Sequence, residues 1–177
     1  IEKQRRANPI LLFVGGNIQR KGLQTVLKSL PKLKQSYPNL QLHVIGKNQN
    51  IVRIKKRSDL MGLTECVKYF GWIPPQEMKK YYRRSTVFVM PSLMEGFGLV
   101  FLEAMAQGLP VIGGKTGGTV ELIKNNKNGI LVEPDNEKDL NQAILSLINK
   151  DEFRNNIIHN GYETVKIYQS QKMVDET

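Results

Sequence analysis

The segment PSLMEGFGLVFLEAMAQGLP, residues 91–110, decides the fold. An apolar tetrapeptide, VFVM, stands directly before it and a helical pattern begins inside it, so we expect a strand, a loop and a helix in succession. The loop holds Glu95, Gly96 and Gly98, and the helix holds Glu103. Two carboxylates placed in this way suit a ligand with vicinal hydroxyls at one end and phosphate at the other.

The same alternation of apolar runs and helical patterns fills the rest of the chain. Strands are expected at 10–14, 40–45, 67–70, 87–90, 110–112 and 129–132, and helices at 23–35, 50–62, 74–84, 99–107, 119–124, 136–149 and 151–168. Pro31 lies inside the first helical pattern and is expected to kink or split it. Alternating strands and helices predict an α/β fold, a doubly wound, Rossmann-like parallel sheet of about six strands with helices on both faces.

In such sheets, ligands bind outside the carboxyl ends of the strands, where helix N-termini present free N–H groups. Three loops with polar or glycine-rich sequences leave the expected strands at that edge. They are GGNIQRKG after the first strand, GWIPP after the third and PSLMEGFG after the fourth. We therefore expect one ligand site built from these three loops.

The first loop combines tight backbone with positive charge. Gly15 and Gly16 allow close backbone approach, and Arg20 and Lys21 stand just before a helix. A diphosphate there would meet a guanidinium, an ammonium and a helix dipole together. The spacing matches neither the Walker A loop nor the dinucleotide GxGxxG motif. The alternative interpretation is a solvated surface pair.

The other two loops offer groups for a nucleoside. In the GWIPP loop, Trp72 either stacks on a planar base or covers the sheet edge with Ile73. Glu103 suits a ribose diol, by analogy with the acidic residue of dinucleotide folds, and its alternative is an ordinary helix-surface acid. Gly117 and Gly118 are expected to bring the backbone close to the site edge.

Composition narrows the class of protein. At 177 residues and 40% hydrophobic, the chain predicts one well-buried domain. The net charge of +10 suits an anionic partner, which could be nucleic acid, acidic lipid or a phosphorylated metabolite. The basic clusters carry no nucleic-acid-binding signature, so we expect solvated helix faces, with attraction to an anionic membrane surface as the main functional alternative.

The single cysteine, Cys66, excludes an intramolecular disulfide, and two distant histidines indicate no metal site. A reducing, cytoplasmic setting fits, with peripheral contact at the inner face of the membrane as an extension of it. The chain opens abruptly, which suggests a cut in a linker. The expected division is a linker remnant at 1–8, one domain at 9–168 and a polar tail at 169–177 that frays or leads to another domain.

Five motifs, FVGGNIQRKG, YFGWIPPQEM, PSLMEGFGLVFLEAMAQGLPVI, GGTVELI and NGILVEP, occur in this order. Through them the chain resembles the C-terminal half of the family 4 retaining glycosyltransferases (glycosyl transferases group 1) of GT-B fold. The resemblance implies a domain that binds a nucleoside diphosphate sugar, without metal or other cofactor. It also implies an N-terminal domain that binds a saccharide or lipid-linked acceptor, which is expected to be absent here, so the chain alone should be inactive.

Site residues follow from the resemblance position by position. It implies that Arg20 and Lys21 bind the diphosphate and that Glu95 contacts the donor sugar's hydroxyls. It further implies that the donor sugar is contacted by Gly96, Phe97 and Gly98, and the phosphate by Leu99 and Val100. Glu103 would contact the ribose and Ile73 the base. Gly16 is a departure, because many members have arginine at that position, and Arg20 is expected to supply the charge.

The resemblance also implies a mechanism of hexosyl transfer in which the acceptor attacks from the face that the leaving phosphate vacates, so that Glu95 need not be a nucleophile. Two other functions stay open. One is a GT-B-type phosphorylase or epimerase, against which the absence of a pyridoxal-phosphate lysine motif speaks. The other is a non-enzymatic basic module that docks on anionic lipid or nucleic acid.

Overall fold

The computed structural model describes residues 7–48 and 50–175 of the chain. One sheet of six parallel strands has the order β3-β2-β1-β4-β5-β6. The strands are β1 (Ile10–Val14), β2 (Gln41–Ile45), β3 (Val67–Gly71), β4 (Val87–Met90), β5 (Val111–Gly114) and β6 (Ile130–Val132). The predicted doubly wound α/β sheet is confirmed.

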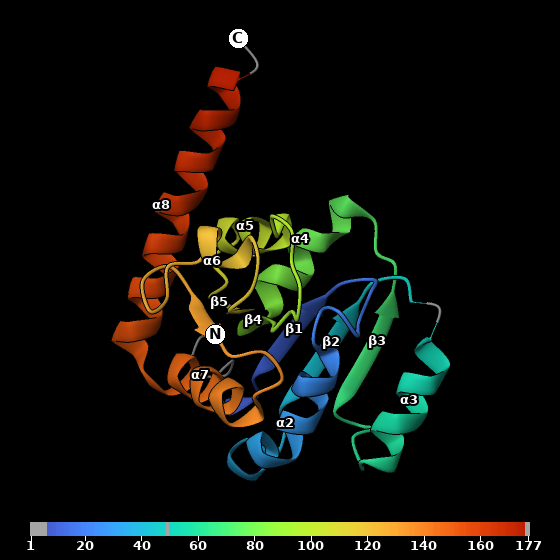
Figure 1. The fold of residues 1–177 in the computed structure, drawn as a ribbon. Helices are drawn as coiled ribbons and strands as arrows, with labels where there is room; N and C mark the ends of the chain where they lie inside the picture. Colours follow the sequence, from blue (N-terminus) through green and yellow to red (C-terminus); the bar gives the residue numbers. More distant parts are fainter. Residues whose placement is uncertain (1–6, 49, 176–177) are drawn as a thin grey trace.

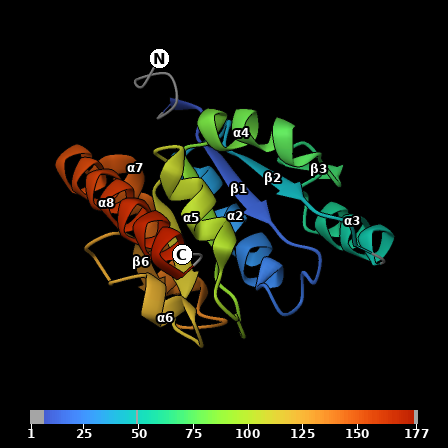
Figure 2. The same ribbon diagram turned by 90° about the horizontal axis from the view of Figure 1, so that it is seen from above.

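Helices cover both faces of the sheet. They are α2 (Leu23–Ser36), α3 (Ile51–Leu60), α4 (Pro75–Arg84), α5 (Leu99–Ala106), α6 (Thr119–Leu122), α7 (Glu137–Asn149) and α8 (Asp151–Asp175). Figures 1 and 2 show α4 and α5 on one face and α2 and α7 on the other. Helix α8 packs against α5 and α7, and its far end rises beyond the body of the domain (Figure 1).

The core lies along the two central strands. Leu11, Leu12 and Phe13 of β1 have no exposed surface, and neither has any residue of β4. Each of these strands has a neighbour on both sides and helices on both faces, so side chains on both faces of the strand point into protein. This explains the continuous apolar runs, and it fixes the strand ends from which the candidate site is built.

Pro31 does not split helix α2, which is one continuous element of 14 residues. Its ring lies on the exposed face of the helix. Leu27 and Leu30 before or beside the proline, and Leu33 after it, are all buried in the core. This packing on both sides of Pro31 offsets the lost backbone hydrogen bond.

Most predicted bounds lie within two residues of the observed ones, although few agree at both ends. Strand β5 was expected at 110–112 but runs from Val111 to Gly114, because Pro110 has no N–H to donate and the two glycines fit where side chains would not. A Cβ on Gly114 would lie 2.2 Å from the Ser92 carbonyl oxygen.

Helix α8 was expected to end at 168 but continues to Asp175. The added turns contain neither proline nor glycine, and the Ser170 hydroxyl donates to the Ile167 carbonyl within the helix at 2.8 Å. Most of the predicted linker at 1–8 and the last two residues of the predicted tail lie outside the described residues.

Candidate functional site

The candidate site lies where the strand order of the sheet reverses. From β1 the chain proceeds to β2 and β3 on one side, and it then crosses to β4, β5 and β6 on the other. The loops that follow β1 and β4 lead to α2 and α5, which lie on opposite faces (Figures 1 and 2). A crevice between two such loops is the usual ligand site of a doubly wound sheet.

Backbone contacts fasten these two loops together. The Leu93 N–H donates to the Arg20 carbonyl at 2.8 Å. Gly22, which precedes helix α2, has a φ of 79°, and a Cβ there would lie 2.1 Å from the Pro91 carbonyl oxygen. Only glycine allows this approach, so the sequence RKG positions the cations beside the Glu95 loop.

The loop after β5 closes on the same place. The Gly118 N–H donates to the Glu95 carbonyl at 3.2 Å, and a Cβ on Gly118 would lie 1.8 Å from the Gly96 carbonyl oxygen. At Gly117 a Cβ would lie 2.2 Å from the Glu95 carbonyl oxygen. The predicted close approach of this glycine pair is confirmed, and it braces the Glu95 loop from behind.

Glu95 forms a buried ion pair with Lys21. The Lys21 ammonium donates to Oε2 of Glu95, and the two side chains are 15% and 7% exposed. The buried Ser92 hydroxyl donates to the same oxygen at 3.3 Å, and the Gly96 N–H donates to Oε1 at 3.1 Å. The carboxylate therefore has its charge balanced and both oxygens engaged by the chain itself.

Arg20, the neighbour of Lys21, lies in a different environment. Its side chain is exposed, and within the described part of the chain its guanidinium makes no ion pair. Gly16 is also exposed, and its carbonyl accepts a hydrogen bond from the Asn48 side chain. A Cβ at Gly16 would lie 3.1 Å from the Lys47 carbonyl oxygen, so a larger residue there would require that carbonyl to shift.

Helix α5 begins at the crevice with exposed N-terminal groups. Gly98 is its N-cap, with a φ of 75°, and no side chain caps the helix. Phe97 and Leu99 on either side are exposed, and the Phe97 ring meets the Tyr168 ring of α8 edge-on at 5.4 Å. The first N–H groups of α5, those of Leu99 and Val100 among them, have no partners within the helix and can bind an anion.

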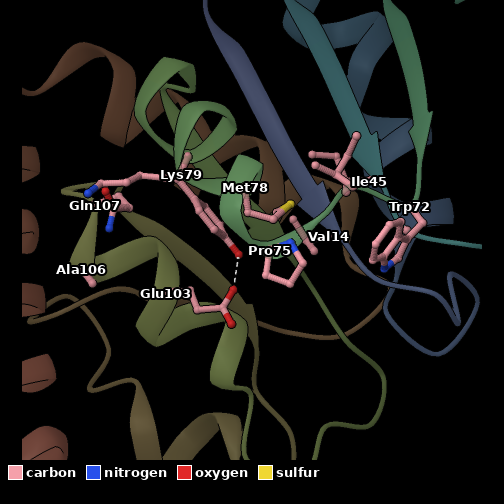
Figure 3. A pocket seen from close by; sticks show the side chains of 12 residues that line it. Val14, Ile45, Trp72, Pro75, Met78, Lys79, Glu103, Ala106 and Gln107 are labelled. Atoms are coloured by element: carbon pink, nitrogen blue, oxygen red, sulfur yellow. Dashed lines mark hydrogen bonds between the residues drawn. The ribbon is translucent and has the colours of Figure 1, made fainter.

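A pocket of about 450 Å³ opens beside this crevice (Figure 3). Glu103 and Trp72 lie on opposite sides of it, with Val14 and Pro75 between them (Figure 3). Its walls come from β1, β2, the loop after β3, α4 and α5. Ile73 also lines it, and Trp72 is 66% exposed, so this ring does not simply cover the sheet edge.

Within the pocket Glu103 is held by Tyr82. The Tyr82 hydroxyl donates to Oε2 of Glu103 at 2.7 Å, and Tyr82 itself is buried. Burial, and next the hydrogen bond and charge of Glu103, raise the pKa of Tyr82 well above its ordinary range. Tyr82 is therefore a permanent donor, and Glu103 keeps an oxygen free for a ligand.

Sequence reasoning brought most of these residues to one edge but missed three contacts. The Lys21–Glu95 pair joins residues 74 positions apart, so no local pattern reveals it. Ser92 gave no signal beyond its place in the loop. Tyr82 lies in the helix predicted at 74–84, for which no buried face was predicted, although its spacing of four residues from Met78 could have indicated one.

The described residues contain neither a cluster of metal ligands nor a membrane-spanning helix. No group of three or more His, Cys, Asp or Glu side chains there could hold a metal ion. None of the helices in that part of the chain is both long and apolar enough to cross a membrane.

The fold and the edge site define a doubly wound α/β domain with a candidate ligand site at its switch point. A family model described as "Glycosyl transferases group 1" matches residues 1–164, and the chain belongs to this family. The predicted resemblance to the C-terminal domain of a GT-B glycosyltransferase is thus confirmed.

Relatives with known names are similar over much of this chain. A D-inositol 3-phosphate glycosyltransferase of Corynebacterium jeikeium is 32% identical over 153 residues, which are 82% of this chain and 36% of that protein. A GDP-mannose-dependent alpha-(1-6)-phosphatidylinositol monomannoside mannosyltransferase of Mycolicibacterium smegmatis is 29% identical over 132 residues, 71% of this chain and 35% of that one. The chain thus spans little more than a third of the length of these relatives.

Among solved structures, the C-terminal domain of LpcC, a glycosyl transferase group 1 family protein of Francisella tularensis, is similar throughout. It is 30% identical with a TM-score of 0.79, and the match covers 94% of this chain and 90% of that domain. The described chain therefore has the shape of one such domain.

Proposed function

We propose that this chain binds the nucleoside diphosphate sugar from which a retaining glycosyltransferase moves a hexosyl group to a saccharide or lipid-linked acceptor. An N-terminal domain that binds the acceptor would complete the cleft. The name of the Mycolicibacterium relative, a GDP-mannose-dependent mannosyltransferase, supports a nucleotide-sugar donor. Anionic lipid contact at the membrane surface belongs to the same proposal as an addition, not as a replacement.

The proposal rests on one observation: cations, free helix N–H groups and a carboxylate lie together at one edge of the sheet. The Lys21–Glu95 pair and the exposed Arg20 come from the loops after β1 and β4. The open N-terminus of α5 lies in the second of these loops. Glu103 faces the adjoining pocket. A ligand with a sugar, a diphosphate and a ribose in sequence matches this order of groups.

The roles follow from these positions. The Lys21 ammonium has three donors, so it can hold Glu95 and a diphosphate oxygen together. Arg20 adds a second cation from the solvent side, and the N–H groups of Leu99 and Val100 bind the phosphate. Glu95, Gly96, Phe97 and Gly98 face the sugar, Glu103 the ribose and the main chain of Ile73 the base. Gly16 leaves room for the diphosphate beside them.

In the reaction, the glycosidic C–O bond breaks and its electron pair goes to the diphosphate oxygen. Lys21, Arg20 and the helix N–H groups stabilise that developing charge without requiring a metal. The acceptor hydroxyl attacks from the same face, and its proton passes to the leaving phosphate. Glu95 is unsuited to act as a nucleophile, because Lys21 balances its charge and Ser92 occupies the same oxygen.

The basic side chains of α4 do not favour a separate docking function. Lys80 pairs with Glu77 at 2.5 Å, and the Arg83 Nε–H donates to Gln107 at 3.1 Å. These contacts are typical of a solvated helix face. Sedimentation with liposomes that contain or lack anionic lipid would detect a docking function directly.

Calorimetry with UDP, GDP and ADP tests the proposal. At least one nucleotide is expected to bind, and Glu103→Ala is expected to weaken that binding by about tenfold or more, since a hydrogen bond to a charged group contributes ~1.5–3 kcal/mol. Glu152→Ala, which removes an exposed carboxylate on α8, is the matched control and should leave binding unchanged. Absence of heat with all three nucleotides at millimolar concentration would overturn the proposal.

A further inference from the structure

Tyr82 is the residue of the pocket that holds Glu103. We infer that Tyr82 is a positioning residue: its hydroxyl fixes one oxygen of Glu103 so that the carboxylate selects the hydroxyls of a ribose over those of a deoxyribose. This inference rests on the proposed function and deepens it, because it assigns the sugar selectivity of the nucleotide to a contact between two helices.

The contact between Tyr82 and Glu103 joins two helices. Tyr82 comes from α4 and Glu103 from α5. Both residues line the pocket, and the 2.7 Å hydrogen bond between them is the dashed line that reaches Glu103 in Figure 3. Tyr82 is 3% exposed, and its ring centroid lies 6.2 Å from that of Phe88. The hydroxyl is therefore fixed by the core, and it transmits that fixed position to a side chain that faces solvent.

The partner of Glu103 is neutral. Among the described residues Glu103 forms no ion pair, in contrast to Glu95. A tyrosine hydroxyl orients the carboxylate but leaves its negative charge uncompensated. One oxygen with two free lone pairs, and part of the other, can then accept from two adjacent hydroxyls. A lysine in place of Tyr82 would instead compete with the ligand.

The hydrogen bond from Tyr82 also reduces the side-chain entropy that Glu103 loses on binding a ligand. A surface glutamate gives up several rotamers when it binds a ligand, which costs on the order of 1 kcal/mol or more. Tyr82 removes most of that cost before binding, because its hydrogen bond already holds the carboxylate in place. Preorganised groups discriminate more sharply, since a missing ligand hydroxyl then leaves a fixed acceptor unpaired.

A tyrosine that only completes the core would behave differently. Loss of its hydroxyl would then lower stability but would leave the preference for ribose unchanged. The ratio of ribonucleotide to deoxyribonucleotide affinity therefore separates the two roles, because a general loss of stability does not change it.

The test measures the affinity of the chain for whichever of UDP, GDP and ADP binds most tightly, and for its 2′-deoxy and 3′-deoxy forms. The wild type is expected to prefer the ribonucleotide by about tenfold. Tyr82→Phe is expected to reduce this preference to about twofold or threefold, and in a Glu103→Ala background it should have no further effect. Tyr81→Phe is the matched control, since Tyr81 is the preceding residue and its ring packs on Phe70.

A second measurement does not depend on the folding of Tyr82→Phe. With ¹³C-labelled tyrosine, the Tyr82 ring-carbon resonance next to the hydroxyl is expected to shift when the ribonucleotide binds, and to shift less with the deoxy forms. If the wild type binds nucleotide but Tyr82→Phe keeps the tenfold preference, or the resonance responds equally to both sugars, the inference is wrong and the proposed function stands. If no nucleotide binds, both fail together.

Discussion

Glu95 and Glu103 stand eight positions apart in one segment, yet the domain holds them by opposite means. Glu95 is buried and paired with a cation, and a second donor and a backbone N–H complete its surroundings. Glu103 is exposed to the pocket and receives one hydrogen bond from a neutral tyrosine. The first carboxylate is already held by donors of the chain itself, whereas the second keeps an oxygen without a partner among the described residues.

The difference shows how one motif serves two purposes. A buried carboxylate must be compensated, because leaving an isolated charge in the interior costs several kcal/mol. Lys21 meets that need, and in doing so it is itself held at the place where a diphosphate would arrive. Glu103 lies near solvent and needs no cation, so its charge remains for hydrogen bonds from hydroxyls.

The largest effect on stability is expected from removal of the cation that pairs with the buried Glu95. Lys21→Met keeps most of the aliphatic volume but leaves Glu95 without its cation, so the free energy of unfolding is expected to fall by about 3 kcal/mol. Urea denaturation followed by circular dichroism measures it. Glu103→Gln, which keeps an acceptor for Tyr82, is expected to change stability far less.

Two variants control this measurement. The Lys115–Glu133 pair is exposed, with side chains 58% and 56% accessible, so Lys115→Met should leave stability nearly unchanged. The double variant Lys21→Met/Glu95→Gln removes both charges and should recover much of the loss. Equal stability losses from Lys21→Met and Lys115→Met would show that the buried pair is not special.

Much of this framework could be predicted from local sequence, because strands and glycine turns leave local signals. The apolar run of β1 gave its bounds without error, and the Gly117–Gly118 pair indicated a close approach that the structure contains. The split predicted as one outcome at Pro31 was wrong, because the helix is continuous. The lost backbone hydrogen bond is a local cost, whereas the packing of Leu30 and Leu33 that offsets it is tertiary. The position of a helix was therefore easier to predict than its continuity.

The partners of the two glutamates could not be predicted. That Lys21 pairs with Glu95 depends on the pairing of β1 with β4, which joins residues far apart in the chain. Tyr82 reaches Glu103 because α4 and α5 lie on the same face of the sheet (Figure 2). The sequence indicates which residues can carry chemistry, but the topology decides which of them are already engaged.

A smaller effect is expected in the pH dependence of stability, through Tyr82, the partner of the exposed Glu103. The pKa of Tyr82 is raised in the folded state, so above the unfolded value of about 10 the unfolded chain binds fewer protons than the folded one. Stability should therefore fall as pH rises above about 10, by about 1.4 kcal/mol per pH unit for this one proton. Below that pH the contribution of Tyr82 is fully present.

The difference between wild type and Tyr82→Phe isolates this proton from the titration of other residues. Denaturation at several pH values between about 9 and 11 measures it. The wild type is expected to lose stability more steeply than Tyr82→Phe over that range, while Tyr81→Phe should follow the wild type. Parallel curves for wild type and Tyr82→Phe would mean that the Tyr82 hydroxyl is neither buried nor bonded to Glu103 in solution.

The smallest effect concerns Arg20 and Lys21, which are adjacent in sequence but differ in burial as Glu95 and Glu103 do. Arg20 is exposed, so its attraction to a diphosphate acts through water and is screened by salt, with a Debye length of about 10 Å at 0.1 M. Arg20→Ala should leave the free energy of unfolding unchanged and weaken nucleotide binding by about threefold at low salt, as expected for an exposed pair worth up to ~1 kcal/mol. At 1 M salt that difference should nearly vanish, because the Debye length is then about 3 Å.

Calorimetry at both salt concentrations measures this difference in nucleotide binding, with Lys32→Ala on the exposed side of α2 as the control. A loss that persists at high salt would instead place the guanidinium in direct, desolvated contact with the phosphate, and the two cations would then not differ in their binding of the nucleotide.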